Sequence, residues 1–358
     1  MKTKRLAILC PYPFGEAPSQ RFRFEQYVDS LQVLGWEVYT YSFLNEKGWK
    51  VFYTDGFSFQ KLKYLALGFV KRWFLMLHVW RFNTVLIHRE AAPVGPPIYE
   101  WIIAKGFRKK IIYDFDDAIW LPNYSKQHQK VHRLKAYWKI KHLIRWAHLS
   151  LAGNHFLASY ALKFSENVVV FPTTIDTDYH RPQNKKLGNR PLVLGWTGSH
   201  STLDYLRILV PALEKLSEHY LFEFVVISNE PPPFTLPNLR YLPWNEASEI
   251  EDLGSIDLGL MPLTDDEWSK GKCGFKALQY LALGIPAMVS TVGVNADIIT
   301  HGVNGFLVDH PDQWYSSIEY VLKHPEPLTD LGRNGRKTIE QRFSVAALTP
   351  TYLSFFNL

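Results

Sequence analysis

The feature that most constrains the fold is a regular alternation of short apolar runs with segments of helical length. In the first half the apolar runs are Leu6–Cys10, Glu37–Ser42, Thr84–His88, Lys110–Asp114, Leu149–Ala152 and Val168–Phe171. In the second half they are Leu192–Trp196, Phe222–Ser228, Arg240–Leu242, Ile256–Met261 and Ile285–Val289, with helical stretches such as Thr202–His219 and Phe275–Leu283 between them. Short buried runs separated by helices are typical of parallel sheets. We therefore predict two open α/β domains in tandem.

The length of the chain agrees with two domains. A chain of 358 residues is long for one hydrophobic core and comfortable for two. After Pro172 the sequence turns irregular and polar through Gly188, so we place the junction near residue 185. The expected division is 1–185, 186–340 and a last helix over 341–358.

Composition and cysteine usage indicate a folded protein of a reducing compartment. Hydrophobic residues make up 47% and charged residues 21%, which excludes a large disordered share. Cys10 and Cys273 are far apart in unrelated contexts, so neither a disulfide framework nor a metal site is indicated. The run Leu6–Cys10 is too short for a signal peptide. We expect a cytoplasmic protein, with peripheral attachment to the inner face of the membrane as an option.

The charge is divided unequally between the two halves. Residues 1–180 hold 25 Lys/Arg against 14 Asp/Glu, whereas residues 181–358 hold 15 against 20. A basic half is either a solvated surface or a face for a membrane or another anionic partner. Nucleic acid is not expected as the partner, because no recognition motif for it is present.

Two segments of the basic half favour an anionic membrane surface, residues 60–82 and 126–148. The apolar stretch Tyr64–Trp80 carries Lys71 and Arg72 at its middle, which argues against a membrane span and favours an interfacial or buried helix with both residues on its outer edge. The second segment is expected to form one basic helix with interleaved aromatic residues and no acidic residue. Basic residues of this kind attract anionic lipid.

A small-residue turn in the second half suits phosphate. The strand Leu192–Trp196 is followed by Thr197-Gly198-Ser199-His200 and then by a helical pattern. A strand, a tight turn and a helix N-terminus present free backbone N–H groups to an anion. The turn is not GxGxxG, which argues against a dinucleotide cofactor.

A second set of polar residues follows the strand that ends at Met261. The polar loop to Cys273 contains Lys270 and Lys272, and ligands of open α/β sheets gather at such carboxyl ends of strands. The two lysines therefore lie where a diphosphate needs cations. After the next helix, the run Thr291 to Asn295 forms another turn before a helix.

The segment KCGFKALQYLALGIPAMVSTVGVNADIITHGVNGFLV resembles the nucleotide-sugar site of the family 4 (group 1) retaining glycosyltransferases of GT-B fold. The segments PLTDDEWSKGKCGFK, GWTGSHST, IIYDFDDAIW and HREAAPVGPP resemble one branch of that family, so the similarity covers most of residues 5–345. The resemblance implies two Rossmann-like domains facing across a cleft. It also implies that the C-terminal domain holds the donor, that the N-terminal domain holds the acceptor, and that the last helix returns to the N-terminal domain.

The resemblance assigns the donor site residue by residue. Gly198 and Ser199 match the turn whose backbone meets the diphosphate, and Gln279 falls where the family usually has a glutamate for the ribose hydroxyls. The backbone amides of Gly293, Val294 and Asn295 are candidates for the donor sugar. No metal ion or other cofactor is expected, since the nucleotide-sugar is a substrate.

The chain departs from the family pattern at two points. Family members commonly carry two glutamates eight positions apart, and here those places are Gly271 and Gln279. Glycine cannot contact the donor sugar as a carboxylate would, so Asp265, Asp266 and Glu267 become further candidates for that contact. The basic pair that many relatives place after the first strand of this domain is also missing, so we assign the phosphate charge to Lys272, then to Lys270.

Three aspartates at the end of a strand, Asp114, Asp116 and Asp117, are the candidates for the acceptor side. In one interpretation an aspartate orients or deprotonates the acceptor hydroxyl. In another they are structural caps, and a metal site is a third option.

Three arginines are further acceptor-side candidates. Arg21 and Arg23 follow the loop after the first strand, and Arg89 lies between His88 and Glu90. A planar guanidinium suits phosphate or a carboxylated sugar. The alternatives are a helix-start position for Arg21 or Arg23 and a local ion pair within His88–Glu90.

The sequence as a whole predicts transfer of a sugar, with retention, from a UDP- or GDP-sugar to a hydroxyl of a glycan or lipid-linked glycan. Two rival interpretations stay open: a sugar-nucleotide epimerase of the same fold, and a non-catalytic nucleotide-sugar-binding protein, which the loss of the carboxylate at Gly271 makes plausible.

Overall fold

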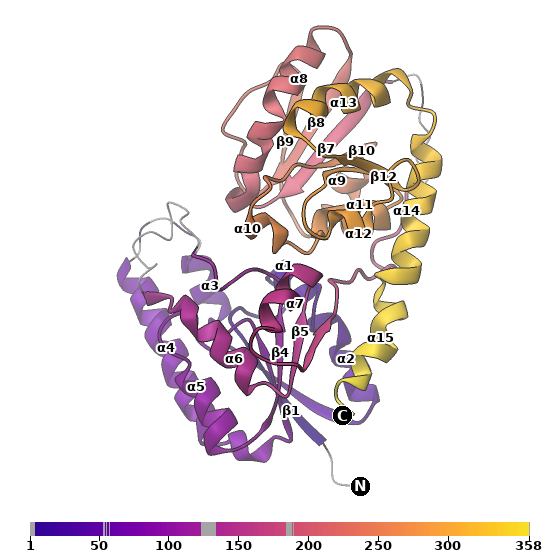
Figure 1. Cartoon of the computed structure of the whole chain (residues 1–358). Helices are drawn as coiled ribbons and strands as arrows, with labels where there is room; N and C mark the ends of the chain where they lie inside the picture. The colour runs from indigo at the N-terminus through magenta and orange to yellow at the C-terminus, as the bar shows by residue number, and fades with distance from the viewer. Residues whose placement is uncertain are drawn as a thin grey trace. The chain divides into compact units, whose positions relative to one another are not determined.

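The computed structural model describes residues 4–52, 54, 56, 58–122, 134–183, 188 and 190–357. They form two compact units, one of Met1–Thr173 with Thr349–Leu358 and one of Thr174–Leu348. Each unit holds one six-stranded parallel sheet with flanking helices (Figure 1). The prediction of two α/β domains is confirmed. The units divide before the junction expected near residue 185.

The first unit has strand order β2-β1-β3-β4-β5-β6. Its strands are β1 (Lys4–Cys10), β2 (Trp36–Ser42), β3 (Thr84–His88), β4 (Lys110–Phe115), β5 (Leu149–Ala152) and β6 (Val168–Val170). Its α-helices are α1 (Pro18–Arg21), α2 (Val28–Val33), α3 (Glu46–Phe52), α4 (Ser58–Met76), α5 (Ile98–Trp101), α6 (Ile140–Trp146) and α7 (His155–Ala161). Shorter turns of helix are η1 (Glu25–Tyr27), η2 (Val79–Arg81), η3 (Ile102–Gly106) and η5 (Tyr137–Lys139). The strands match the predicted apolar runs closely, because β1, β3, β4 and β5 are almost wholly buried.

Helix α4 differs from expectation at Arg72. Lys71 is exposed as predicted, but Arg72 is 1% exposed and does not lie on the outer edge. Its guanidinium donates to the carbonyl oxygens of Cys10 (2.8 Å), Tyr41 (2.8 Å) and Ala91 (2.7 Å). These carbonyls lie at or just beyond the carboxyl ends of β1, β2 and β3. Arg72 therefore ties α4 to three neighbouring strands.

The single basic helix predicted over 126–148 is only partly present among the described residues. Residues 126–133 lie outside them. Leu134 is helical, Ala136 interrupts the helix with a left-handed conformation of φ 48°, and helical structure resumes over η5 and α6 from Tyr137 to Trp146. Lys139 is buried and pairs with Glu90 at 2.8 Å, so it belongs to the interior. Within the described ranges, no helix is both long and apolar enough to cross a bilayer.

The second unit has strand order β12-β11-β10-β7-β8-β9. Its strands are β7 (Leu192–Gly198), β8 (Phe222–Ser228), β9 (Leu239–Pro243), β10 (Leu258–Met261), β11 (Ala287–Ser290) and β12 (Gly305–Val308). Its helices are η6 (His200–Ile208), α8 (Val210–Ser217), α9 (Glu249–Gly254), α10 (Glu267–Lys270), α11 (Phe275–Ala282), α12 (Asn295–Ile298), η7 (Pro311–Gln313), α13 (Trp314–Lys323) and α14 (Leu328–Arg342). Two details correct the sequence analysis. The helix expected over Thr202–His219 is split into η6 and α8, and the turn before Gly305 leads into a strand, β12, that was not predicted.

Helix α11 is fixed against the centre of this sheet. The hydroxyl of Tyr280 accepts a hydrogen bond from the backbone N–H of Thr197 in β7 at 2.9 Å. The ring of Tyr280 covers Gly259 in β10, where an added Cβ would lie 2.2 Å from it. Glycine at 259 is therefore required for the helix to approach, and Tyr280 holds α11 near the end of β7.

The C-terminal residues return to the first unit, as the resemblance implied. Helix α15 (Val345–Ser354) leaves the second unit, and residues from Thr349 onward pack with the first (Figure 1). The ring of Tyr352 stacks on Tyr27 with centroids 4.1 Å apart, and Phe355 and Phe356 are also buried. This aromatic cluster anchors the end of the chain.

Candidate functional site

The turn after β7 is a close turn between a strand and a helix. Gly198 is the last residue of β7, and a Cβ there would lie 2.5 Å from the Trp196 ring and 2.7 Å from Oγ1 of Thr202. The carbonyl of Ser199 accepts from the backbone N–H of Thr202, which starts η6. Only glycine fits this close turn. The predicted residues Gly198 and Ser199 therefore lie at the junction between β7 and η6.

Lys276, in the first turn of α11, is a site residue that sequence reasoning missed. Its ammonium lies 5.4 Å from the centroid of the Trp196 ring, the ring that packs against Gly198. No ion pair joins it to a carboxylate among the described residues. Burial, and to a smaller extent the like charge of Lys272, lowers the pKa of Lys276 to about 8. The signal in the sequence was a single lysine at the start of an otherwise apolar helix.

The two lysines that were predicted lie in different surroundings. Lys272 is half-buried, with its ammonium 4.7 Å from the centroid of the Trp268 ring. Lys270 is exposed and forms an ion pair with Asp265 at 2.9 Å. Asp266 caps α10 by accepting from the backbone N–H of Ser269 at 2.7 Å. Of the lysines, Lys272 and Lys276 are thus the pair close enough to influence each other.

The turn Gly293–Asn295 packs against the loop that carries these lysines. Gly293 has φ 59°, and a Cβ there would lie 3.0 to 3.3 Å from the backbone of Lys270. Val294 is 9% exposed. Asn295 is buried and its Nδ2 donates to the carbonyl of Ser290 at 3.0 Å. The side chain of Asn295 therefore holds the turn.

Gln279 is buried in α11, with 2% of its surface exposed. Its Nε2 donates to Oε1 of Glu249 at 3.3 Å. Glu249 is the first residue of α9 and was not predicted as a site residue. The structure therefore places a carboxylate behind Gln279, on a different helix. No sequence spacing connects the two positions, which are thirty residues apart.

In the first unit, Asp114 is an interior group. Its carboxylate pairs with the guanidinium of Arg23 and accepts from Nδ1 of His88 at 2.7 Å. Burial alone would raise the pKa of Asp114, but Arg23 and His88 outweigh it and the pKa is about 2. Arg23 is 2% exposed and also donates to the carbonyl of Phe171. Arg23 and Asp114 therefore satisfy each other inside the unit.

Arg89 and the other two aspartates are nearer the surface. The Nε of Arg89 donates to Asp116 at 2.7 Å, and Asp117 lies 3.8 Å from its Nη2. Burial acts to raise the pKa of Asp116, but the charge of Arg89 prevails and lowers it. Arg89 has φ 58°, a left-handed conformation that is unusual for a non-glycine residue. Arg21 is half-buried, with its guanidinium carbon 5.4 Å from the Phe22 ring centroid.

The three polar residues that end β3 do not pair with each other. His88 binds Asp114, Arg89 binds Asp116, and Glu90 binds Lys139. Of the three aspartates, Asp114 pairs with Arg23 and His88, whereas Asp116 and Asp117 share Arg89. Within the described ranges, no group of three His, Cys, Asp or Glu side chains is arranged to hold a metal ion.

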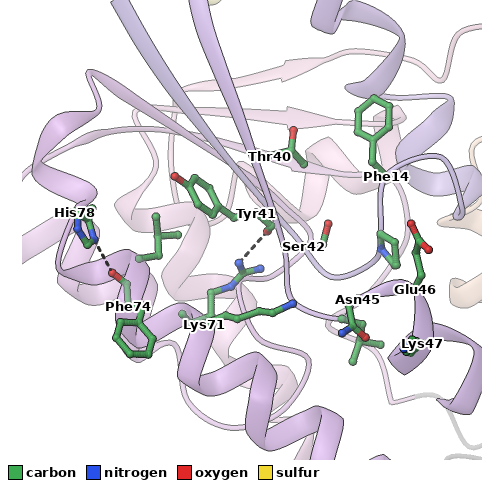
Figure 2. Close-up of a pocket in the computed structure, with 14 residues that line it drawn as sticks. Phe14, Thr40, Tyr41, Ser42, Asn45, Glu46, Lys47, Lys71, Phe74 and His78 are labelled. Carbon is green, nitrogen blue, oxygen red and sulfur yellow. Dashed lines mark hydrogen bonds between the residues drawn. The ribbon is translucent and has the colours of Figure 1, made fainter.

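A groove of about 860 Å³ opens on the first unit beside α4. It lies between the end of β2 and the α4 side chains, and its lining includes Ser42, Asn45, Lys47, Lys71 and Phe74. Figure 2 shows the side chain of Lys71 extending along the groove toward Asn45. The rim of this groove is therefore both basic and aromatic.

Comparison with known proteins gives a family match over part of the second unit. Residues 191–324 match the model of the family described as Glycosyl transferases group 1. The resemblance in the sequence is thereby confirmed over β7 to α13, which includes every donor-side candidate. No curated protein matches the chain by sequence.

Solved structures extend the likeness to the whole chain. Sucrose-phosphate synthase from Thermosynechococcus elongatus has a TM-score of 0.72 at 12% identity, covering 99% of this chain and 98% of that chain. HepE of Anabaena in complex with UDP-glucose has a TM-score of 0.69 at 12% identity, covering 99% of both chains. The lipopolysaccharide outer core galactosyltransferase WaaB has a TM-score of 0.62 at 14% identity, covering 99% of this chain and 100% of that chain. At these identities the likeness establishes the fold, and the predicted GT-B fold is confirmed.

Proposed function

We propose that the chain is a retaining glycosyltransferase, of the hexosyltransferase class, that moves the sugar of a UDP- or GDP-sugar to a hydroxyl of a glycan or lipid-linked glycan. The observation that carries the proposal is the convergence of Lys276 and Trp196 on the Gly198 turn in the second unit. A close glycine turn supplies backbone N–H groups, and the ammonium of Lys276, which pairs with no carboxylate of the described residues, supplies charge. Together they suit a diphosphate.

The lysines would act on the leaving group. When the bond between sugar and diphosphate breaks, negative charge grows on the phosphate oxygen. Lys276, with Lys272 beside it, stabilises that charge in a site where burial strengthens the interaction. Lys270 is neutralised by Asp265 and contributes less. This assignment moves the main phosphate role from Lys272 and Lys270 to Lys276 and Lys272.

The acceptor side would rest on Asp116 and Asp117 with Arg89. Because Arg89 lowers the pKa of Asp116, this carboxylate is a weak base and is suited to orienting a hydroxyl by accepting its hydrogen bond. The leaving phosphate oxygen would receive the acceptor proton. Asp114 and Arg23 would position the loop ends from the interior, and Arg21 would contact the acceptor from α1.

The test is incubation of the protein with UDP- and GDP-sugars, with and without an extract of lipid-linked glycans. The proposal expects a sugar attached to an acceptor, with the anomeric configuration of the donor, and no such product without acceptor. An isomerised nucleotide-sugar formed without acceptor would indicate the epimerase instead. Tight donor binding with neither hydrolysis nor transfer would indicate a binding protein.

We also propose that the first unit docks on an anionic membrane through α4. Large side chains at helical spacing are exposed along α4 and directly after its end, among them Leu62 (61%), Val70 (49%), Trp73 (51%) and Leu77 (66%). Residues 58–81 contain five Lys or Arg and no Asp or Glu, and all of the five except the buried Arg72 remain for a surface role. An apolar stripe with a basic rim suits the boundary between headgroups and acyl chains. In this proposal the groove lined by Lys71 and Lys47 takes the anionic lipid headgroup.

Sedimentation with vesicles tests the membrane proposal. At low salt the protein should sediment with vesicles containing phosphatidylglycerol and stay in solution with phosphatidylcholine alone. The double variant Trp73→Ser/Leu77→Ser should lose this binding, whereas Leu221→Ser, which removes an apolar side chain 81% exposed on the second unit, should keep it. Equal sedimentation of all three proteins would contradict the proposal.

A further inference from the structure

Glu249 is a buried carboxylate whose two hydrogen-bond donors are neutral side chains. It is 6% exposed, and its Oε1 accepts from Nε1 of Trp244 at 3.1 Å and from Nε2 of Gln279 at 3.3 Å. Its Oε2 is buried with no hydrogen-bond donor, and no basic residue pairs with it in the described part of the chain. A buried charge in this state is costly unless something else uses it. The lack of a hydrogen-bond donor to Oε2 points to a bound molecule that supplies this donor.

The carboxylate fixes the orientation of the Gln279 amide. A carboxylate can only accept hydrogen bonds, so the NH₂ of Gln279 must face Glu249. The carbonyl oxygen of Gln279 is then turned the other way and is available as an acceptor. The negative charge behind the amide also strengthens that acceptor, because hydrogen bonds in series polarise one another.

The position of this pair connects it with the phosphate site. Gln279 lies three residues after Lys276 in α11, so both side chains are on one face of the helix. Trp244 follows the carboxyl end of β9 and is 37% exposed, which leaves part of its ring open to a ligand. An acceptor of hydroxyl groups and an aromatic surface therefore lie next to cations suited to phosphate.

We propose that Glu249 is the positioning residue of a ribose site: it holds the Gln279 amide so that Oε1 accepts from the ribose hydroxyls of the donor nucleotide. The inference rests on the proposed function. In this arrangement the negative charge of the ribose site is on Glu249 of α9, whereas Gln279 of α11, which would contact the ribose, is neutral. A ribose hydroxyl, or a water that bridges to it, donates the hydrogen bond that Oε2 of Glu249 lacks.

A reciprocal exchange tests the inference. Calorimetry would compare UDP and GDP with their 2′,3′-dideoxy forms and with pyrophosphate. The wild type should prefer the hydroxylated nucleotide by about tenfold or more. Glu249→Gln should lose most of that preference while pyrophosphate binding stays unchanged. Gln279→Glu should bind nucleotide weakly, because two carboxylates then meet, and the double variant Glu249→Gln/Gln279→Glu should recover the preference.

The control is Glu251→Gln, which removes an exposed carboxylate of the same helix and should behave as wild type. Recovery in the double variant also excludes misfolding as the cause of the single effects. An undiminished preference in Glu249→Gln, or a double variant no better than Gln279→Glu, would overturn the inference alone. If wild type bound neither nucleotide nor pyrophosphate, the proposed function would fall with it.

Discussion

At the scale of single residues, Lys276 is the group whose surroundings say most about function. Its ammonium is half-buried over an aromatic ring with a second lysine nearby and no carboxylate partner among the described residues. Such a site is unfavourable for the charge until an anion enters. Bound diphosphate would therefore raise the pKa of Lys276, so anion binding and protonation favour each other.

This coupling predicts how nucleotide binding depends on pH. In the free protein the pKa of Lys276 is about 8, so the cation is present below that pH and is lost above it. The affinity for a UDP- or GDP-sugar, whose diphosphate does not titrate in this range, should be flat from pH 6 to about pH 7.5 and should then fall, approaching tenfold per pH unit for one titrating group. In Lys276→Met the affinity should be lower and nearly independent of pH over this range. Calorimetry at several pH values measures this, and an identical fall in the variant would contradict it.

At the scale of elements, Arg72 explains how α4 is attached while its outer face stays apolar. The Arg72 guanidinium donates to backbone carbonyls at the ends of three strands. The inner side of α4 is therefore held to the sheet without any contact made by its outer side. Burial lowers the pKa of Arg72 to about 10, which still leaves it charged at neutral pH. The interior attachment leaves the exposed stripe of α4 available for a partner.

Arg72→Met should destabilise the first unit strongly. The change leaves three buried carbonyl oxygens without their donor, at about 1–3 kcal/mol for each unsatisfied group that water cannot reach. The free energy of unfolding in urea should fall by about 3 kcal/mol or more. The neighbouring variant Lys71→Met, on the exposed side, should change it by about 0.5 kcal/mol at most. Equal effects of the two changes would show that the three hydrogen bonds contribute little.

At the scale of the whole molecule, the return of α15 makes the first unit depend on the end of the chain. Tyr352 is buried, packs on Tyr27 and Phe171, and is followed by two further buried aromatic residues. The unit formed by residues up to Thr173 is thus completed by residues from Thr349 onward.

Tyr352→Ala should therefore loosen the first unit and leave the second unchanged. Loss of a buried aromatic side chain costs about 3–5 kcal/mol. Hydrogen exchange followed by mass spectrometry should show faster exchange around Tyr27 and Phe171, with β7 and β10 unaffected. Tyr320→Ala, which removes a ring 54% exposed on α13, is the control. Faster exchange in both units would contradict the assignment of α15 to the first.

The sequence predicted the fold well because buried strands leave a local signal. The apolar runs of β1, β3, β8 and β11 needed no knowledge of their neighbours. Arg72 and Lys139 were misplaced because a basic residue in an apolar helix looks the same whether it faces solvent or reaches carbonyl groups of distant strands. β12 was missed because its four residues follow a glycine turn.

For the site, residues in local motifs were found and residues joined only by tertiary structure were not. Gly198 and Ser199 stand in a turn that the sequence displays directly. Lys276 is recognised as a site residue by its contact with Trp196, eighty positions earlier. Glu249 is recognised by its hydrogen bond with Gln279, thirty positions later. Contacts of this kind depend on how strands are ordered in the sheet, which local pattern does not specify.

The central claim is that a nucleotide diphosphate sugar binds the second unit through Lys276. The most direct measurement is calorimetric titration of UDP- and GDP-sugars into the wild type, Lys276→Met and Lys270→Met. The account predicts binding to the wild type, a loss of about tenfold or more in Lys276→Met, and a change of less than about threefold in Lys270→Met, whose ammonium already pairs with Asp265. Undiminished affinity in Lys276→Met, or no binding of any nucleotide-sugar to the wild type, would contradict it.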